Sequence, residues 1–183
     1  MKLEEQKISQ KTLYEGKVIT VWLCDAKLPN GHISLREVVH HSGGAAVLFV
    51  KDNKILLERQ FRFPYNKVIW EIPAGKLNKG EDPLDAAKRE LEEETGFRAE
   101  NLRHLIDIYP SPGYTDEIIY IYLADGADMV GSHLDEDEFI NAQFIDISEV
   151  ERMIDSGEIN DAKTVAAVYK YCLLYTSDAA DEL

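Results

Sequence analysis

The stretch RELEEETGF, from Arg89 to Phe97, places four glutamates within five positions. Like charges three or four positions apart on a helix repel each other by about 0.2–0.5 kcal/mol per pair. The glutamates also precede Gly96, a residue type that commonly ends helices, where the helix dipole disfavours anions by about 0.3–1 kcal/mol each. Carboxylates gathered at this end of a helix must be neutralised, which water or a bound cation can do.

Three of these glutamates point in similar directions on a helix. At roughly 100° per residue, Glu90, Glu93 and Glu94 span about a third of the circumference, whereas Glu92 points elsewhere. Oxygen ligands at this density suit Mg²⁺ or Mn²⁺, since Zn²⁺ prefers nitrogen and sulfur. Mg²⁺ typically takes one or two carboxylates and completes its coordination with water and substrate phosphates. These residues alone predict either a metal–pyrophosphate site or an ordinary solvated helix surface.

The helix that carries the carboxylates has clear ends in the segment EDPLDAAKRELEEETGF. Asp82 suits the N-cap, Pro83 suits the first helical position, and Gly96 suits the C-terminal end. A buried stripe is predicted from three apolar residues at helical spacing, namely Leu84, Ala87 and Leu91. Two further helices are expected near the C-terminus, in SEVERMIDSG and DAKTVAAVYKY.

Strands are expected to dominate the rest of the chain. Residues 1 to about 41 show the two-residue alternation of side chains that is typical of strands, and they contain a turn at Pro29–Gly31. This pattern predicts short antiparallel strands. The segments AAVLFV and ILLERQFRF are separated by the turn KDNK and predict a hairpin, and VIWEIPAG predicts another strand. Strands joined mostly by hairpins, followed by helices, indicate an α+β fold with helices packed on a mixed sheet.

Composition limits the class of protein. The chain has 183 residues, enough for one domain with a small appendage, and its net charge of −14 argues against nucleic acid or an anionic membrane as partner. Two cysteines without a CxxC motif exclude a disulfide scaffold or a zinc ribbon. The N-terminus is too polar for a signal peptide, and no apolar run approaches the roughly 20 residues of a membrane span. We therefore expect a cytoplasmic protein.

The segment GKLNKGEDPLDAAKRELEEETGF resembles the Nudix box, with fixed gaps between its matching positions. Those positions are Gly75, Glu81, Arg89, Glu90, Leu91, Glu93, Glu94, Gly96 and Phe97. The resemblance implies a Nudix fold, in which helices sandwich mixed β-sheets, over residues 42–171. It also implies hydrolysis of a nucleoside diphosphate linked to another group. Gly75 and Gly96 are expected to permit tight turns beside the helix, and Glu81 to support the preceding loop.

The same resemblance implies roles for the residues of the acidic helix. Glu90 and Glu94 are expected to ligate metal together with the backbone carbonyl of Ala74, and Glu93 is expected to assist them. Arg89 lies four residues before Glu93, so an ion pair between them can brace the carboxylates. We expect two or three Mg²⁺ ions in the working enzyme, with Mn²⁺ as a possible substitute.

The segment YPSPGYTDE, with Pro112 sixteen residues after Gly96, resembles the ADP-ribose pyrophosphatase subgroup. Similar segments are LPNGHISLREVV, ERQFRFPYNKVIWEIPAGKL and LDEDEF with the later DAKT. The resemblance implies that residues 1–41 form a small antiparallel strand domain that is swapped across a homodimer. Such a dimer would explain a segment that makes a meagre core alone.

Substrate contacts follow from this resemblance. Arg36 and Glu37 are expected to hold ADP-ribose, partly across the dimer, and Arg62 to contact a phosphate, which suits a guanidinium fork. Pro112 and Gly113 are expected in the substrate-binding loop. Expected products are AMP and ribose 5-phosphate. The alternatives are another nucleotide sugar, such as ADP-glucose or GDP-mannose, and a non-catalytic ADP-ribose sensor, which the complete set of box carboxylates disfavours.

A general base is expected on a loop downstream of the box. HLDEDEFI supplies two equal candidates, Glu136 and Glu138, either of which can deprotonate a metal-activated water. The final segment, residues 172–183, has a different interpretation. CLLYTSDAADE resembles a translated transposon sequencing adaptor, and the alternative is a native frayed helix end. We expect that the natural sequence diverges after Tyr171.

Overall fold

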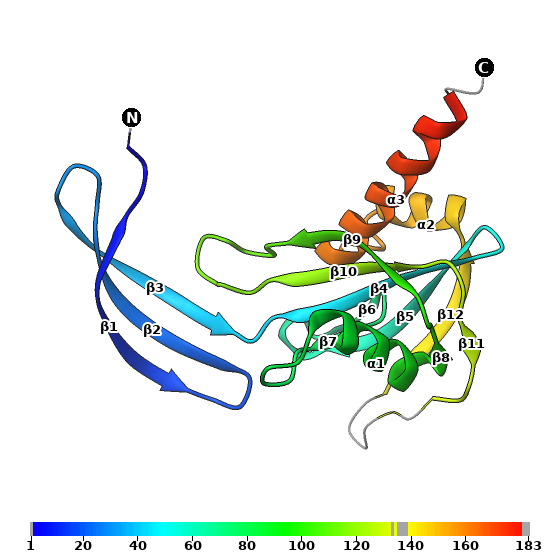
Figure 1. Cartoon of the computed structure of the whole chain (residues 1–183), viewed down its shortest axis with the longest axis horizontal. Helices are drawn as coiled ribbons and strands as arrows, with labels where there is room; N and C mark the ends of the chain where they lie inside the picture. Colours follow the sequence, from blue (N-terminus) through cyan, green and yellow to red (C-terminus); the bar gives the residue numbers. More distant parts are fainter. Residues whose placement is uncertain (1, 133, 135–138, 181–183) are drawn as a thin grey trace. The chain divides into compact units, whose positions relative to one another are not determined.

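The structure is a computed structural model that describes residues 2–132, 134 and 139–180, with side chains described as far as residue 174 (Figure 1). The chain divides into two compact units. The first holds the residues up to Gly43 together with Tyr109–Ile118, and the second holds Gly44–Ile108 and the residues from Ile119 onward. Glu136 and Glu138 lie outside the described residues. Among the described helices, none has the length and hydrophobicity needed to cross a membrane.

The first unit contains the small antiparallel sheet expected for the N-terminal segment. Its strands run in the order β1 (Gln6–Glu15), β2 (Ile19–Lys27) and β3 (Ile33–His41). β1 is exposed along its whole length. The Tyr109–Ile118 segment lies beside β3 in this unit. The Val39 amide of β3 donates a hydrogen bond to the Tyr114 carbonyl at 2.7 Å. The unit therefore makes little core of its own, and its exchange across a dimer stays a prediction.

The second unit is built on a mixed sheet whose path is β12-β5-β4-β10-β9, with β6 added beside β5 and β7 beside β4. β4 and β10 are parallel, and the other pairs are antiparallel. The strands are β4 (Gly44–Lys51), β5 (Lys54–Arg62), β6 (Lys67–Glu71), β7 (Ala74–Lys76), β9 (Leu102–Ile108), β10 (Ile119–Ala124) and β12 (Asn141–Asp146). A 3₁₀ turn, η1 (Phe63–Tyr65), lies between β5 and β6. Two short strands, β8 (Phe97–Arg98) and β11 (Asp128–Met129), pair with each other outside this sheet.

Two hydrophobic clusters cover opposite faces of this sheet. Side chains alternate between faces along a strand, so neighbouring residues of β4 enter different clusters. Ala46 and Leu48 pack with α2 (Ile147–Asp155) and α3 (Ala162–Ala180). Val47 and Phe49 pack with α1 (Pro83–Thr95). Helices thus sandwich a mixed sheet, which confirms the predicted α+β Nudix fold.

The acidic helix α1 has the ends that its sequence predicts. The Asp82 side chain caps it by accepting a hydrogen bond from the Leu84 amide at 2.8 Å. Gly96 ends it with a φ of +74°. A Cβ on Gly96 would also lie 2.8 Å from the carbonyl carbon of Gly131, so glycine is required there by both conformation and space. These local signals fix where the helix presents its glutamates.

Candidate active site

Arg89 connects the carboxylates of α1 to the loop that precedes the helix. Its Nε and Nη2 atoms donate to the two oxygens of Glu81, at 2.8 and 2.9 Å. Its Nη1 atom donates to Glu90 at 2.7 Å and to Glu93 at 2.9 Å. Hydrogen bonds from Arg89 lower the pKa of Glu81 to about 2, so this carboxylate is ionised at neutral pH. One guanidinium therefore braces three carboxylates, including the Glu93 pair expected from sequence spacing.

Gly75 is required for the position of Glu90, and the reason differs from the tight turn expected from sequence. The residue lies within strand β7, and its φ is not in the left-handed region. A Cβ built on Gly75 would lie 2.0 Å from the carboxylate carbon of Glu90. Glycine is thus needed because the carboxylate occupies the space above the strand. The expected turn at Gly75 is wrong, whereas the one at Gly96 is confirmed.

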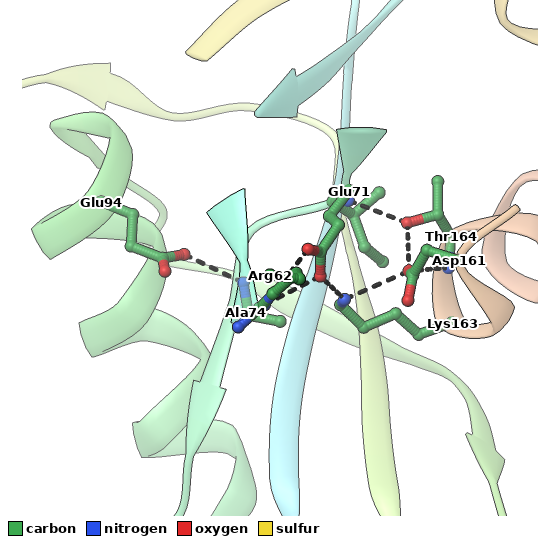
Figure 2. Close-up of polar contacts among 8 residues, drawn as sticks. Arg62, Glu71, Ala74, Glu94, Asp161, Lys163 and Thr164 are labelled. Carbon is green, nitrogen blue, oxygen red and sulfur yellow. Dashed lines mark hydrogen bonds and ion pairs between the residues drawn. The ribbon is translucent and has the colours of Figure 1, made fainter. Parts of the chain in front are cut away.

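Glu94 is the most buried carboxylate of the α1 group, with 6% of its surface exposed. Its Oε2 atom accepts a hydrogen bond from the backbone amide of Ala74 at 2.9 Å (Figure 2). Ala74 begins strand β7, so this contact joins the end of the acidic helix to the strand beside it. The structure therefore brings together Glu94 and Ala74, two of the residues that sequence analysis predicted as metal ligands.

Arg62, the last residue of β5, makes a two-pronged ion pair with Glu71, the last residue of β6. Nε and Nη2 of Arg62 lie 2.6 and 2.8 Å from the two Glu71 oxygens. Burial alone would raise the pKa of Glu71, but hydrogen bonding from Arg62 and the charges of Lys163 and Arg62 outweigh it and lower that pKa. The Arg62 side chain is 37% exposed, whereas that of Glu71 is 2% exposed. The arginine thus lies between a buried anion and solvent.

Glu58 adds a carboxyl group that sequence analysis missed. It pairs with Glu71 across β5 and β6 and has no exposed surface. Burial, followed by the charge of Glu71, raises its pKa to about 8. Neither Glu58 oxygen has a hydrogen-bond partner among the described residues when both it and Glu94 are ionised. A contact with Glu94 becomes a hydrogen bond only when one of the two carries a proton, and the raised pKa of Glu58 favours its protonated form.

The signal for Glu58 and Glu71 was an acidic residue inside each of two apolar strand segments, ILLER and VIWEI. Charged residues are almost never fully buried unless they are paired or functional. Lys163 carries the same signal, because it lies near the start of an apolar helix and is 7% exposed. These three residues could have been selected from sequence as buried charges, although their partners could not.

The donor set of this region fits a hard divalent cation. Its carboxylates belong to Glu90 and Glu94, the carboxyl group of Glu58 interacts with Glu94, and the backbone of Ala74 lies beside them. Among the described residues, no three His, Cys, Asp or Glu side chains are arranged to hold a metal by themselves. Mg²⁺ takes few protein carboxylates and completes its coordination with water and phosphate, so Glu90, Glu94 and the Ala74 backbone suit it. Ligation by the Ala74 carbonyl stays a prediction.

The remaining predicted residues that the structure describes lie in the first unit. Arg36, on β3, donates through Nε and Nη2 to Glu5 at 3.0 and 2.6 Å, and Glu37 is its neighbour. Pro112 and Gly113 lie in the Tyr109–Ile118 segment beside the end of β3. The second unit holds Arg62, Ala74 and the α1 residues. The structure therefore divides the predicted substrate contacts between its two units.

Comparison with known proteins defines the family. A NUDIX domain model matches residues 39–168, and the chain belongs to this family of hydrolases. An ADP-ribose pyrophosphatase from Bacillus subtilis (strain 168) is 44% identical over 169 residues, covering 91% of each chain. A methanol dehydrogenase activator from Bacillus methanolicus is 45% identical over 168 residues, covering 90% of this chain and 91% of the relative. A solved structure of an ADP compounds hydrolase superposes with a TM-score of 0.85 at 20% identity, covering 97% and 98% of the two chains.

Proposed function

We propose that this chain hydrolyses the pyrophosphate bond of ADP-ribose to AMP and ribose 5-phosphate in a Mg²⁺-dependent reaction. The observation that carries the proposal is the meeting of Glu94 with the Ala74 amide beside the Arg89-braced carboxylates Glu90 and Glu93. An anionic substrate approaches such a group of carboxylates only through cations. The name of the relative from Bacillus subtilis supports ADP-ribose as the substrate.

The residues of the acidic helix and the strand beside it each have a role in this proposal. Glu90 and Glu94 hold the metal together with the Ala74 carbonyl, while Arg89 keeps Glu90 and Glu93 in place. A bound Mg²⁺ supplies charge neutralisation at the pyrophosphate and acidifies a coordinated water. No covalent nucleophile is needed, because positioning and charge neutralisation supply most of the catalysis in phosphoryl transfer. Two or three ions are proposed, with Mn²⁺ able to replace Mg²⁺.

Arg62 is proposed to bind a substrate phosphate. A guanidinium has five N–H donors, and Arg62 uses only two of them on Glu71. Both of its side-chain hydrogen bonds to described residues go to Glu71, which leaves three donors. Two of them, one on Nη1 and one on Nη2, point in the same direction at the end of the guanidinium, so they form a second fork of the kind that binds phosphate oxygens. Because the pair with Glu71 holds the planar guanidinium in one orientation, it also fixes the direction of the second fork.

The remaining proposed substrate contacts belong to the first unit. Arg36 and Glu37 are proposed to contact ADP-ribose, partly across a domain-swapped homodimer, and Pro112 and Gly113 to line the substrate loop. The proposed base is Glu136 or Glu138. The cytoplasmic location and the origin of residues 172–183 stay predictions.

A substrate screen tests the proposal. Purified protein is incubated with ADP-ribose, ADP-glucose, GDP-mannose, NADH or dinucleoside polyphosphates, with Mg²⁺, with Mn²⁺ or with EDTA, and products are separated by chromatography. We expect AMP and ribose 5-phosphate from ADP-ribose, with the highest kcat/KM of the set and no turnover in EDTA. Faster turnover of another nucleotide sugar would show that this compound, and not ADP-ribose, is the preferred substrate. Tight ADP-ribose binding without products would instead identify a sensor.

A second candidate function follows from the Bacillus methanolicus relative, which is as similar as the pyrophosphatase. The chain would then increase the activity of a methanol dehydrogenase. Adding the protein to such a dehydrogenase, with Glu94→Gln as the control, tests this function. Activation by the wild-type protein but not by Glu94→Gln would favour the activator function. No activation by the wild-type protein would leave ADP-ribose hydrolysis as the function.

A further inference from the structure

The first turn of α3 contacts the segment that leads into the Nudix box. Asp161 precedes the helix, and its Oδ2 atom accepts hydrogen bonds from the Thr164 amide at 3.0 Å and from the Thr164 hydroxyl at 2.7 Å. Lys163 lies in the same turn, with Nζ 3.1 Å from that oxygen. These contacts give the turn one fixed arrangement, which presents an ammonium and a hydroxyl to the neighbouring strands (Figure 2).

The ammonium of Lys163 is paired with Glu71. It donates to Oε2, the same Glu71 oxygen that accepts from Nη2 of Arg62. The side chains of Lys163 and Glu71 are 8% and 2% exposed, so little water competes for these contacts. Glu71 is therefore held from one side by α3 and holds Arg62 on the other. Without Lys163, Oε2 of Glu71 would keep Arg62 as its cationic partner. The Glu71 carboxylate could then move, and the Arg62 guanidinium would move with it.

The hydroxyl of Thr164 fixes the backbone next to Glu71. It accepts a hydrogen bond from the buried Ile72 amide at 2.9 Å. Two residues further on, the Ala74 amide donates to Glu94 on α1. The four residues from Glu71 to Ala74 are thus tied to α3 at one end and to the acidic helix at the other (Figure 2).

We propose that Asp161 and the first turn of α3 that follows it, as far as Thr164, form a positioning element of the active site. Lys163 acts through Glu71 on the orientation of Arg62, and Thr164 acts through Ile72 on Ala74 and Glu94. These residues touch neither substrate nor metal. The proposal rests on the proposed function, since it assumes that Arg62 binds a substrate phosphate. The competing interpretation is a purely structural role, because buried ion pairs often specify packing and add little to stability.

A double-mutant cycle separates the two roles. If Lys163 acts through Arg62, Lys163→Met raises KM for ADP-ribose by about five- to tenfold in the wild-type background, with a smaller change in kcat. In an Arg62→Gln background the same substitution changes KM by less than about twofold, because the group it positions is gone. Lys54→Met is the matched control, since Lys54 makes an exposed pair with Asp146 at 4.0 Å, and it leaves KM unchanged.

Additive effects in the two backgrounds would overturn the proposal, as would a Lys163→Met protein with a lower Tm but an unchanged KM. If wild-type protein prefers another nucleotide, the proposed substrate fails and the cycle is run on that nucleotide. If it hydrolyses none, the cycle is run on the Kd for inorganic pyrophosphate with Mg²⁺, measured by calorimetry. The positioning proposal is thus decided separately from the proposed function.

A second pair of variants keeps the proposal testable if Lys163→Met folds poorly. Thr164→Val removes the hydroxyl without changing any buried charge, and Thr164→Ser keeps it. We expect Thr164→Val to lose hydrogen-exchange protection at the Ile72 and Ala74 amides and to lower kcat by about fivefold or more, and Thr164→Ser to restore both. Loss of protection at Ile72 with unchanged kcat and unchanged protection at Ala74 would show that the contact is structural and would overturn the proposal.

Discussion

Glu58 and Glu71 face each other across β5 and β6, both fully enclosed, but only Glu71 is paired with cations. Arg62 and Lys163 surround Glu71 and lower its pKa. Burial and the charge of Glu71 raise the pKa of Glu58 to about 8. The pKa values of two adjacent carboxyl groups are therefore shifted in opposite directions. Glu71 is the anion that orients Arg62, and Glu58 is the carboxyl group beside Glu94.

The raised pKa of Glu58 predicts how the stability of the metal-free protein depends on pH. The folded protein binds this proton more tightly than the unfolded chain, whose carboxyl has a pKa near 4.5. The stabilising effect is complete below pH 4.5 and is lost as the pH rises toward 8. Glu58→Gln removes this loss, so its advantage over wild type should grow across that range, by a few kcal/mol at most at about 1.4 kcal/mol per pKa unit.

Urea unfolding of both proteins in EDTA at pH 5, 6, 7 and 8 measures that difference. Glu149→Gln is the matched control, because it makes the same change in an exposed pair with Arg152. The Glu149 variant should follow wild type at every pH. A constant difference between Glu58→Gln and wild type would show that the proton on Glu58 is not linked to folding.

Glu94→Gln should abolish turnover without destabilising the metal-free protein. The amide oxygen of glutamine can still accept from the Ala74 amide, and losing the charge relieves repulsion on α1. We expect kcat to fall by about 10²–10³-fold and the apo Tm to stay level or rise. Glu92→Gln, on a residue paired with Arg98, is the control and should keep its activity. A marked fall in the apo Tm of Glu94→Gln would indicate a structural role instead.

Gly75→Ala should separate activity from stability. The new methyl group meets the Glu90 carboxylate, which is the flexible end of a long side chain and can move away at small cost. Folding should therefore change by less than about 1 kcal/mol, whereas kcat should fall by about 100-fold because Glu90 is displaced. Gly126→Ala adds the same methyl group in open space and serves as the control. Full activity in Gly75→Ala would mean that the position of Glu90 is not needed.

Sequence alone predicted what depends on neighbours along the chain. The ends of α1 follow from Asp82 and Gly96, and the grouping of its glutamates follows from helical spacing. The contact between Lys163 and Glu71 joins residues 92 positions apart and depends on the packing of α3 against the sheet. No local pattern encodes that distance. Gly75 shows a related limit, since its need for space arises from a side chain on another element.

The general base is the part of the proposed site that kinetics must locate, because Glu136 and Glu138 lie outside the described residues. A base acts in its ionised form, so wild-type kcat should fall as the pH drops through its pKa. Exchanging the true base for glutamine should lower kcat by at least about tenfold and remove this acidic limb, while the other exchange should keep it. Profiles of kcat against pH for the two single variants at saturating ADP-ribose and Mg²⁺ make the choice. Near wild-type kcat in both variants would exclude this loop as the source of the base.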